Sequence, residues 1–546
     1  RGYNYAWHGS TIAELFGHIL YSFTRDVTEH CNPNEPEFTA ESFGYNPLES
    51  TGREWYCHPV DELIYQEYSD REATSLHYQV SRCVEVKVTD ASSIENNEET
   101  EDIASYEYRA MAWKRLRPSV IRTICKSMYI GGLISLVSAV IVGSINILIS
   151  YINMKTEQNC EFSLKKKIPV QVQWMKTISG SILCAFLYIW YFINVLFLFR
   201  PFQLIGVKKK LIFTSCLLYC LDAVYRVLLQ YLGVSESKLS VSQKIPLNAL
   251  FITSVCAQIY LITKHFSGYL WSRKQKLILF FQLVVPGSFC FLLSILTTLI
   301  YPLYNAQNKN GKLIIALFAP LVGVFLKVIS RISAQRLYNI THPGYSFVLL
   351  VPLYCGAAVI FRILQADLGR LQTIALLGVI HGAAEVIERS TMVFIDHLCH
   401  QLVVRRSSSP WGSFRTPRRE RLMADITIMS ILFESAAIVS VNGFLYLYQY
   451  VYLTDKPLLT LLQRFAIHTS VQLVIEWFFT SVSLAIETRY QNIAVMAVWQ
   501  KRWKRHTLVA IVNAVPIAIW TGTNLLAVVH GRFHELLNQT CKMPFT

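Results

Sequence analysis

Residues 371–400 read LQTIALLGVIHGAAEVIERSTMVFIDHLCH, which is apolar and long enough to cross a bilayer although it carries several charged side chains. At about 100° per residue, one quarter of the helix circumference holds a methionine and four polar residues, namely His381, Glu385, Glu388, Met392 and Asp396. A charged group at the bilayer centre costs about 2.5–3.5 kcal/mol in insertion assays, so such groups usually face a protein interior or a water-filled cavity. The stretch therefore predicts a membrane helix with one polar face turned inward.

The rest of the chain has the composition of an integral membrane protein. Of its 546 residues, 53% are hydrophobic and only 16% are charged, whereas ordinary soluble domains are nearer one quarter charged. After Pro118 we find eleven apolar segments of roughly the length that a spanning helix needs. They are 128–152, 177–199, 211–233, 245–263, 277–304, 312–334, 345–363, 371–396, 422–453, 459–487 and 506–530. We expect an all-α polytopic membrane protein with about eleven transmembrane helices over residues 118–534.

The distribution of charged residues along the chain predicts how the protein is oriented in the membrane. The formal net charge is +15, yet acidic residues outnumber basic ones about two to one within residues 1–117. The positive excess lies between the apolar segments, so we expect the bilayer, and no nucleic acid, as a partner. Its main clusters are Lys208–Lys210, Arg273–Lys276, Arg405–Arg421 and Lys501–Arg505, with Lys165–Lys167 as the exception. The positive-inside rule then predicts a cytosolic amino terminus and a short extracytosolic tail over 535–546.

The first 117 residues read as a small, acidic, mixed α/β domain outside the membrane. Residues 90–102 (DASSIENNEETED) have almost no apolar side chain and are expected to be disordered. Two Cys/His pairs, His30-Cys31 and Cys57-His58, lack the compact spacing of a zinc site, so the sequence leaves any metal unknown. The acidic surface of this domain could dock on a protein partner.

The predicted topology puts two cysteines on the oxidising side of the membrane. Cys160 and Cys541 could form a disulfide there, and two free thiols are an equally good alternative. Most of the other cysteines lie inside apolar segments, where they behave as small hydrophobic residues.

Three successive apolar segments carry acids near mid-depth. These are Glu385 and Glu388 in the eighth segment, Glu434 in the ninth and Glu476 in the tenth. In the tenth segment, His468 and Gln472 are spaced to share a face with Glu476. Together with His381, these side chains could line a route along which a proton or a cation moves, because carboxylates and imidazoles exchange protons. The alternative is a set of buried polar contacts that hold helices together.

Other charges in the apolar segments have simpler interpretations. Asp222 and Arg226 are four residues apart and of opposite sign, so we expect an intrahelical ion pair, and a gate that breaks this pair is the sharper alternative. Lys327 and Arg331 lie towards the end of segment 312–334, where we expect them to snorkel to the membrane surface.

We expect a transporter or channel for a small cation, for protons or for a proton-coupled solute. The sequence has no phosphate-binding loop, nucleophile elbow or kinase signature, so we expect no cofactor and no ATP-driven transport. A structural or assembly subunit remains an alternative.

An intramembrane enzyme is the other alternative. The span count, His381 within an apolar stretch and the preceding Asn339 resemble membrane-bound O-acyltransferases, although Tyr338 stands where that family usually has tryptophan. The resemblance covers only these few residues, so we do not assign the chain to that family.

Overall fold

The computed structural model describes residues 120–156, 170–199, 201–234, 241–267, 272–337, 341, 344–368, 371–404, 417–452, 457–489, 493 and 495–533. The acidic domain over 1–117, with residues 90–102, lies outside the described residues, as do the tail over 535–546, Cys160 and Cys541. The predicted disulfide and the two Cys/His pairs therefore lie outside the described residues.

The described part of the chain is all-α, as expected. Its twelve α-helices and three short helical turns cover each of the eleven apolar segments. They are α4 (Val120–Val137), η3 (Ser138–Val142), α5 (Gly143–Thr156), α6 (Val170–Leu198), η5 (Pro201–Leu204), α7 (Lys208–Tyr231), α8 (Val241–Phe266), α9 (Arg273–Asn305), α10 (Lys309–Gln335), η7 (Ser346–Leu349), α11 (Val351–Asp367), α12 (Leu371–Val404), α13 (Pro417–Tyr452), α14 (Leu458–Arg489) and α15 (Val495–Phe533).

The protein is a multi-pass membrane protein. Within the described residues, nine helical stretches are long and apolar enough to cross a bilayer. α11 has 17 residues and is shorter than each of these nine stretches, the shortest of which has 22 residues. α15 is interrupted by a non-helical residue, Arg502, and contains Pro516.

α13 is the central helix of the bundle. In its most apolar stretch 89% of the residues are buried, whereas the corresponding value for α12 is 22%. α13 packs against α4, α5, α11, α14 and α15. Its buried residues lie on every side of the helix, as expected for a helix surrounded by others.

Two glycines let α5 lie directly against α13. A Cβ atom on Gly143 would lie 2.7 Å from Val439 Cγ1, and one on Gly443 would lie 2.5 Å from Ile147 Cγ1. Small residues allow such backbone approach between membrane helices. The π-helical turn η3 precedes Gly143, and Ser138 there donates a hydrogen bond to the carbonyl of Leu432 on α13.

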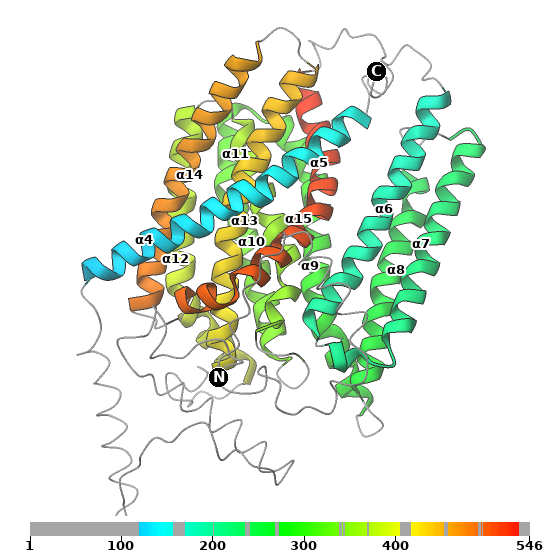
Figure 1. Cartoon of the computed structure of the whole chain (residues 1–546), viewed down its shortest axis with the longest axis horizontal. Coiled ribbons are helices and arrows are strands. Elements are labelled where there is room, and N and C mark those ends of the chain that lie inside the picture. Colours follow the sequence, from blue (N-terminus) through cyan, green and yellow to red (C-terminus); the bar gives the residue numbers. More distant parts are fainter. Residues whose placement is uncertain are drawn as a thin grey trace, which may run out of the picture.

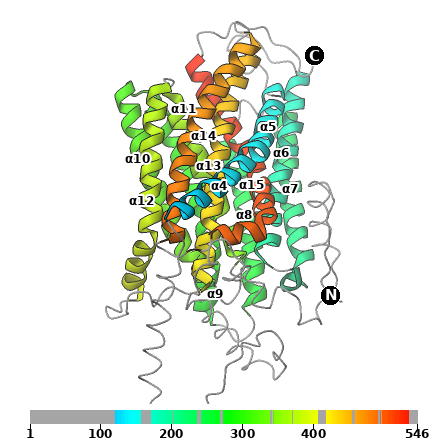
Figure 2. The same ribbon diagram turned by 60° about the vertical axis from the view of Figure 1, so that its left-hand side comes forward.

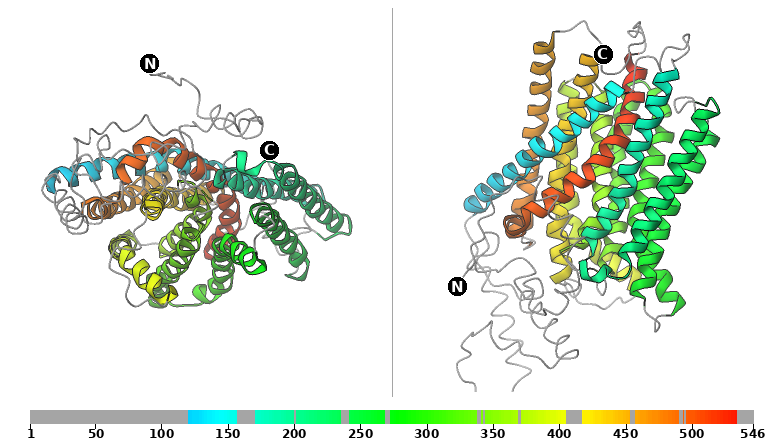
Figure 3. Two further views of the ribbon diagram at one scale, coloured as in Figure 1. Left: turned by 90° about the horizontal axis from the view of Figure 1, so that it is seen from below. Right: turned by 45° about the vertical axis from the view of Figure 1, so that its right-hand side comes forward.

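Two groups of helices lie around this centre. α4, η3 and α5 form one rod that crosses the bundle obliquely, and α15 crosses on the same side (Figures 1 and 2). Helices α6, α7 and α8 stand together at one end, as the view from below also shows (Figure 3). Asn513 of α15 connects the two groups, because it accepts a hydrogen bond from Trp190 and donates one to Asn194, each at 3.0 Å.

Candidate functional site

Acids of two helices meet at an arginine of a third. Arg362 lies on α11, which is buried over most of its length. Its Nη2 atom is 3.1 Å from Glu434 Oε2 on α13 and 2.5 Å from Glu476 Oε2 on α14. All three side chains are at most 12% exposed. One buried guanidinium therefore holds two carboxylates from two different helices.

A glutamine fixes this arginine in place. Gln365, one turn further along α11, accepts a 3.0 Å hydrogen bond from Arg362 Nη1 through Oε1. Its Nε2 atom donates at 2.7 Å to the carbonyl oxygen of Ile374 on α12. On the other side, Thr480 donates to Glu476 Oε1 at 3.3 Å. The cluster thus extends from α11 to α12 and α14.

A second arginine joins α12 to α14. Arg389 donates two hydrogen bonds of 2.8 Å to the two carboxylate oxygens of Glu487. Both side chains are at most 3% exposed. Such a bidentate pair is the strongest geometry that arginine offers a carboxylate. Thr427 of α13 also donates to Glu487, at 3.3 Å.

Glu385 lies between the two arginines and is more loosely held. Its Oε1 atom is 3.4 Å from Arg389 Nη1 and 3.5 Å from Ser430 Oγ, both long for hydrogen bonds. The side chain is 18% exposed. It also interacts electrostatically with Glu434 and Glu476. Glu385 is therefore held more loosely than Glu434, Glu476 and Glu487.

The expectation that Lys327 and Arg331 snorkel to the membrane surface is wrong. Lys327 is 7% exposed and Arg331 is fully buried. The ammonium group of Lys327 lies 4.9 Å from the ring centre of Tyr354, and it interacts electrostatically with Glu388, Glu434 and Glu385. These acids provide the opposite charge that lets a lysine remain inside the bundle.

Together these residues form the buried charge cluster: Glu385, Glu388, Glu434, Glu476, Glu487, Lys327, Arg362 and Arg389. The structure thus brings together all four of the predicted acids. Sequence reasoning missed Arg362, Glu487 and Lys327 as members. Each was visible as a charged residue within an apolar segment.

The predicted histidines lie at the edge of this arrangement. A ring nitrogen of His381, Nε2, lies 3.1 Å from the carbonyl oxygen of Ala316, which joins α12 to α10. His468 is half-buried, and its ring packs edge-on against Tyr446 at 5.9 Å between centroids. Gln472 is 5% exposed, and its Nε2 atom has no hydrogen-bond partner within the described structure. His468 and Gln472 therefore do not join the two arginines.

The ion pair on α7 is a separate site. Arg226 Nε lies 2.6 Å from Asp222 Oδ1, and the hydroxyl of Tyr188 on α6 donates to Asp222 Oδ2 at 3.3 Å. Its role as a gate stays a hypothesis. Asn339, the second residue of the acyltransferase alternative, lies outside the described residues.

The cluster is not arranged as a metal site. Within the described ranges, no three His, Cys, Asp or Glu side chains are placed to hold a metal ion. Arginine occupies much of the hydrogen-bonding capacity of Glu434, Glu476 and Glu487.

No known family, curated protein or solved structure matches this chain. Its function is therefore argued from the geometry of the site.

Proposed function

We propose that the protein is a proton-coupled membrane carrier, with the buried charge cluster as its proton-exchange site. The proposal keeps the eleven-helix topology and the cytosolic amino terminus that the sequence predicts.

The observation that carries the proposal is the charge balance of the cluster. Five glutamates face three basic side chains, Lys327, Arg362 and Arg389. Arg331, one turn beyond Lys327 on α10, brings the bases to four and still leaves one negative charge in excess. An uncompensated charge inside a bundle is costly, so a proton or a cation is needed to neutralise it.

Glu385 is the best candidate for the exchanging group. Glu434, Glu476 and Glu487 each have an arginine within 3.1 Å, whereas Glu385 has only contacts of 3.4 Å and 3.5 Å and is partly exposed. Loss of its proton would strengthen its attraction to Arg389 and compete with the Arg389–Glu487 pair. Protonation of Glu385 would in this way be linked to how α12 packs on α14.

Flux measurements test this function. We would reconstitute the full chain in vesicles that contain a pH-sensitive dye, impose a pH jump and follow the internal pH. The account predicts protein-dependent proton movement that Glu385→Gln abolishes without loss of folding. Asp367→Asn is the matched control, because Asp367 pairs with Lys312 at 3.0 Å outside the cluster. A correctly assembled Glu385→Gln protein with the wild-type pH profile would exclude the proposal.

A structural or assembly subunit is the second candidate. The bidentate Arg389–Glu487 pair favours it, because such a pair holds two helices in one arrangement. In addition, the structure has a cavity between α6, α8 and α9, and neither His381 nor Glu385 lines it. For a subunit of this kind, wild-type vesicles should behave as protein-free ones in the same assay.

A further inference from the structure

A cavity separates helices α6–α8 from the rest of the bundle. It has a volume of about 440 Å³ and is lined by residues of α6, α7, α8, α9, η7, α11 and α15. Ligand pockets for small organic molecules are typically about 300–1,000 Å³. It is distinct from the buried charge cluster, with which it shares no residue.

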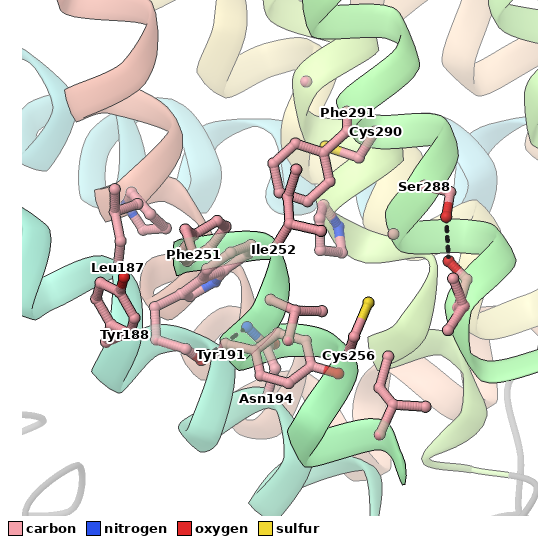
Figure 4. A pocket seen from close by; sticks show the side chains of 18 of the residues that line it. Leu187, Tyr188, Tyr191, Asn194, Phe251, Ile252, Cys256, Ser288, Cys290 and Phe291 are labelled. Carbon is pink, nitrogen blue, oxygen red and sulfur yellow. Dashed lines mark hydrogen bonds between the residues drawn. The ribbon is translucent and has the colours of Figure 1, made fainter. Parts of the chain in front are cut away.

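The walls of the cavity are mainly apolar and aromatic. Tyr188, Phe251 and Phe291 form a chain of edge-on contacts, with ring centres 5.5 Å and 5.7 Å apart. Figure 4 shows these rings with Tyr191 and Cys256 around one space. Rigid aromatic walls suit a ligand with a rigid apolar body.

The charges that line the cavity compensate each other. Among the described residues that line the cavity, Asp222 and Arg226 are the only ionic ones, and they form the 2.6 Å pair described above. Tyr188 adds a hydrogen bond to Asp222. A charged ligand would find no unpaired opposite charge here and would lose its hydration, so the cavity favours a neutral ligand.

Two polar groups remain available to such a ligand. They are the hydroxyl of Tyr191 and the side-chain amide of Asn248, and both residues line the cavity. A phenol hydroxyl in an apolar pocket usually has a partner. The ligand therefore needs at least one hydrogen-bonding group.

The cavity is continuous with the outer surface of the membrane helices. Three of its lining residues, Ile252, Phe291 and Ile295, are 47%, 37% and 54% exposed. They lie on α8 and α9, whose exposed apolar faces meet the bilayer. A ligand dissolved in the membrane could enter here without crossing water.

We propose that this cavity binds a neutral, rigid amphipathic molecule of the sterol class, with its apolar body against the aromatic walls and its hydroxyl at Tyr191. The proposal is independent of proton exchange, because it concerns binding and uses none of the residues of the buried charge cluster.

Two glycines allow the cavity to be filled without disturbing its walls. A Cβ atom on Gly287 of α9 would meet nothing within 4 Å, and one on Gly356 of α11 would meet only Cys290 Sγ, at 4.0 Å. Gly287→Leu and Gly356→Leu should therefore occupy the space that a ligand needs. Both changes also replace glycine by a better helix former.

The test is binding of dehydroergosterol, a fluorescent sterol, to the full chain in phosphatidylcholine nanodiscs, followed by energy transfer from tryptophan. Wild type should give saturable transfer, and each glycine variant should weaken binding by at least about tenfold. Tyr191→Phe should weaken it about three- to tenfold, the value of one hydrogen bond. Val224→Phe is the control, because Val224 is 63% exposed on α7 and does not line the cavity.

Three results would overturn the proposal. The first is no saturable transfer to wild type. The second is unchanged sterol binding in both glycine variants while their thermal unfolding matches that of wild type. The third concerns a phosphatidylcholine with a fluorescent polyene acyl chain. If the glycine variants lose energy transfer to this lipid but keep energy transfer to dehydroergosterol, the cavity is a site for bilayer lipid.

Discussion

Arg362 of α11 and Glu476 of α14 are in contact, with Nη2 2.5 Å from Oε2, and the same nitrogen lies 3.1 Å from Glu434 of α13. A single guanidinium thus connects the central helix α13 to two neighbours. Both acids form an ion pair with this arginine. Its removal should therefore affect the fold more than the removal of either acid.

We predict that Arg362→Met destabilises the protein by about 3–5 kcal/mol, because it leaves two buried carboxylates without a partner. Chemical unfolding in detergent would measure the loss. Adding Glu434→Gln and Glu476→Gln to the same protein should recover most of it. A single Arg362→Met variant as stable as wild type would show that the acids are not charged or not buried.

Arg389→Lys should also destabilise the protein, by about 1–3 kcal/mol. Lysine has a single ammonium group and cannot reproduce the two parallel hydrogen bonds to Glu487. The matched control is Lys312→Arg in the pair with Asp367, where the lysine side chain is 22% exposed. That change should stay within about 0.5 kcal/mol. Equal effects of the two substitutions would contradict the importance of the bidentate geometry.

Gly443→Ala should cost about 1–3 kcal/mol, since the new methyl group would lie 2.5 Å from Ile147 Cγ1. Ile147→Ala shortens the neighbouring side chain. The loss of stability caused by Gly443→Ala should therefore be smaller when it is measured in the Ile147→Ala protein. Gly287→Ala is the control, because its methyl group meets nothing within 4 Å and adds up to about 1 kcal/mol of helix propensity. Thermal unfolding of the four variants would compare them directly.

The topology is testable by protease protection of tags at the two ends. We expect the amino-terminal tag on the cytosolic side and the carboxyl-terminal tag on the opposite side, because the basic clusters of the loops obey the positive-inside rule in this orientation. Finding both ends on one side would mean that the number of spans is even and that the count of eleven is wrong.

The acids of the site could be found in the sequence because a carboxylate within an apolar segment is conspicuous. Glu385, Glu434 and Glu476 were identified in this way, and the structure brings them together. Arg362 was overlooked although the same criterion applied to it. Lys327 was placed at the membrane surface because a sequence shows distance from a helix end but not which neighbours face the side chain.

The order of the helices in space could not be predicted from the sequence. The polar face of residues 371–400 predicts a helix turned inward, but the sequence does not indicate that α13 is the helix that the others surround. Lipid tails and a protein core are both apolar, so hydropathy does not distinguish a helix in lipid from one inside the bundle. Close packing at Gly143 and Gly443 marks α13 as central, and that information lies in pairs of residues far apart in the chain.

The most direct test of proton exchange in the buried charge cluster is infrared difference spectroscopy of the purified chain during a pH titration. The carbonyl stretch of a protonated carboxyl group is separate from that of a carboxylate. The account predicts a protonated-carboxyl band at neutral pH that disappears as the pH rises and that is missing in Glu385→Gln, while Asp367→Asn keeps it. The same titrating band in wild type and in Glu385→Gln would contradict the assignment of the proton to Glu385. No such band at any pH near neutrality would contradict proton exchange in the cluster itself.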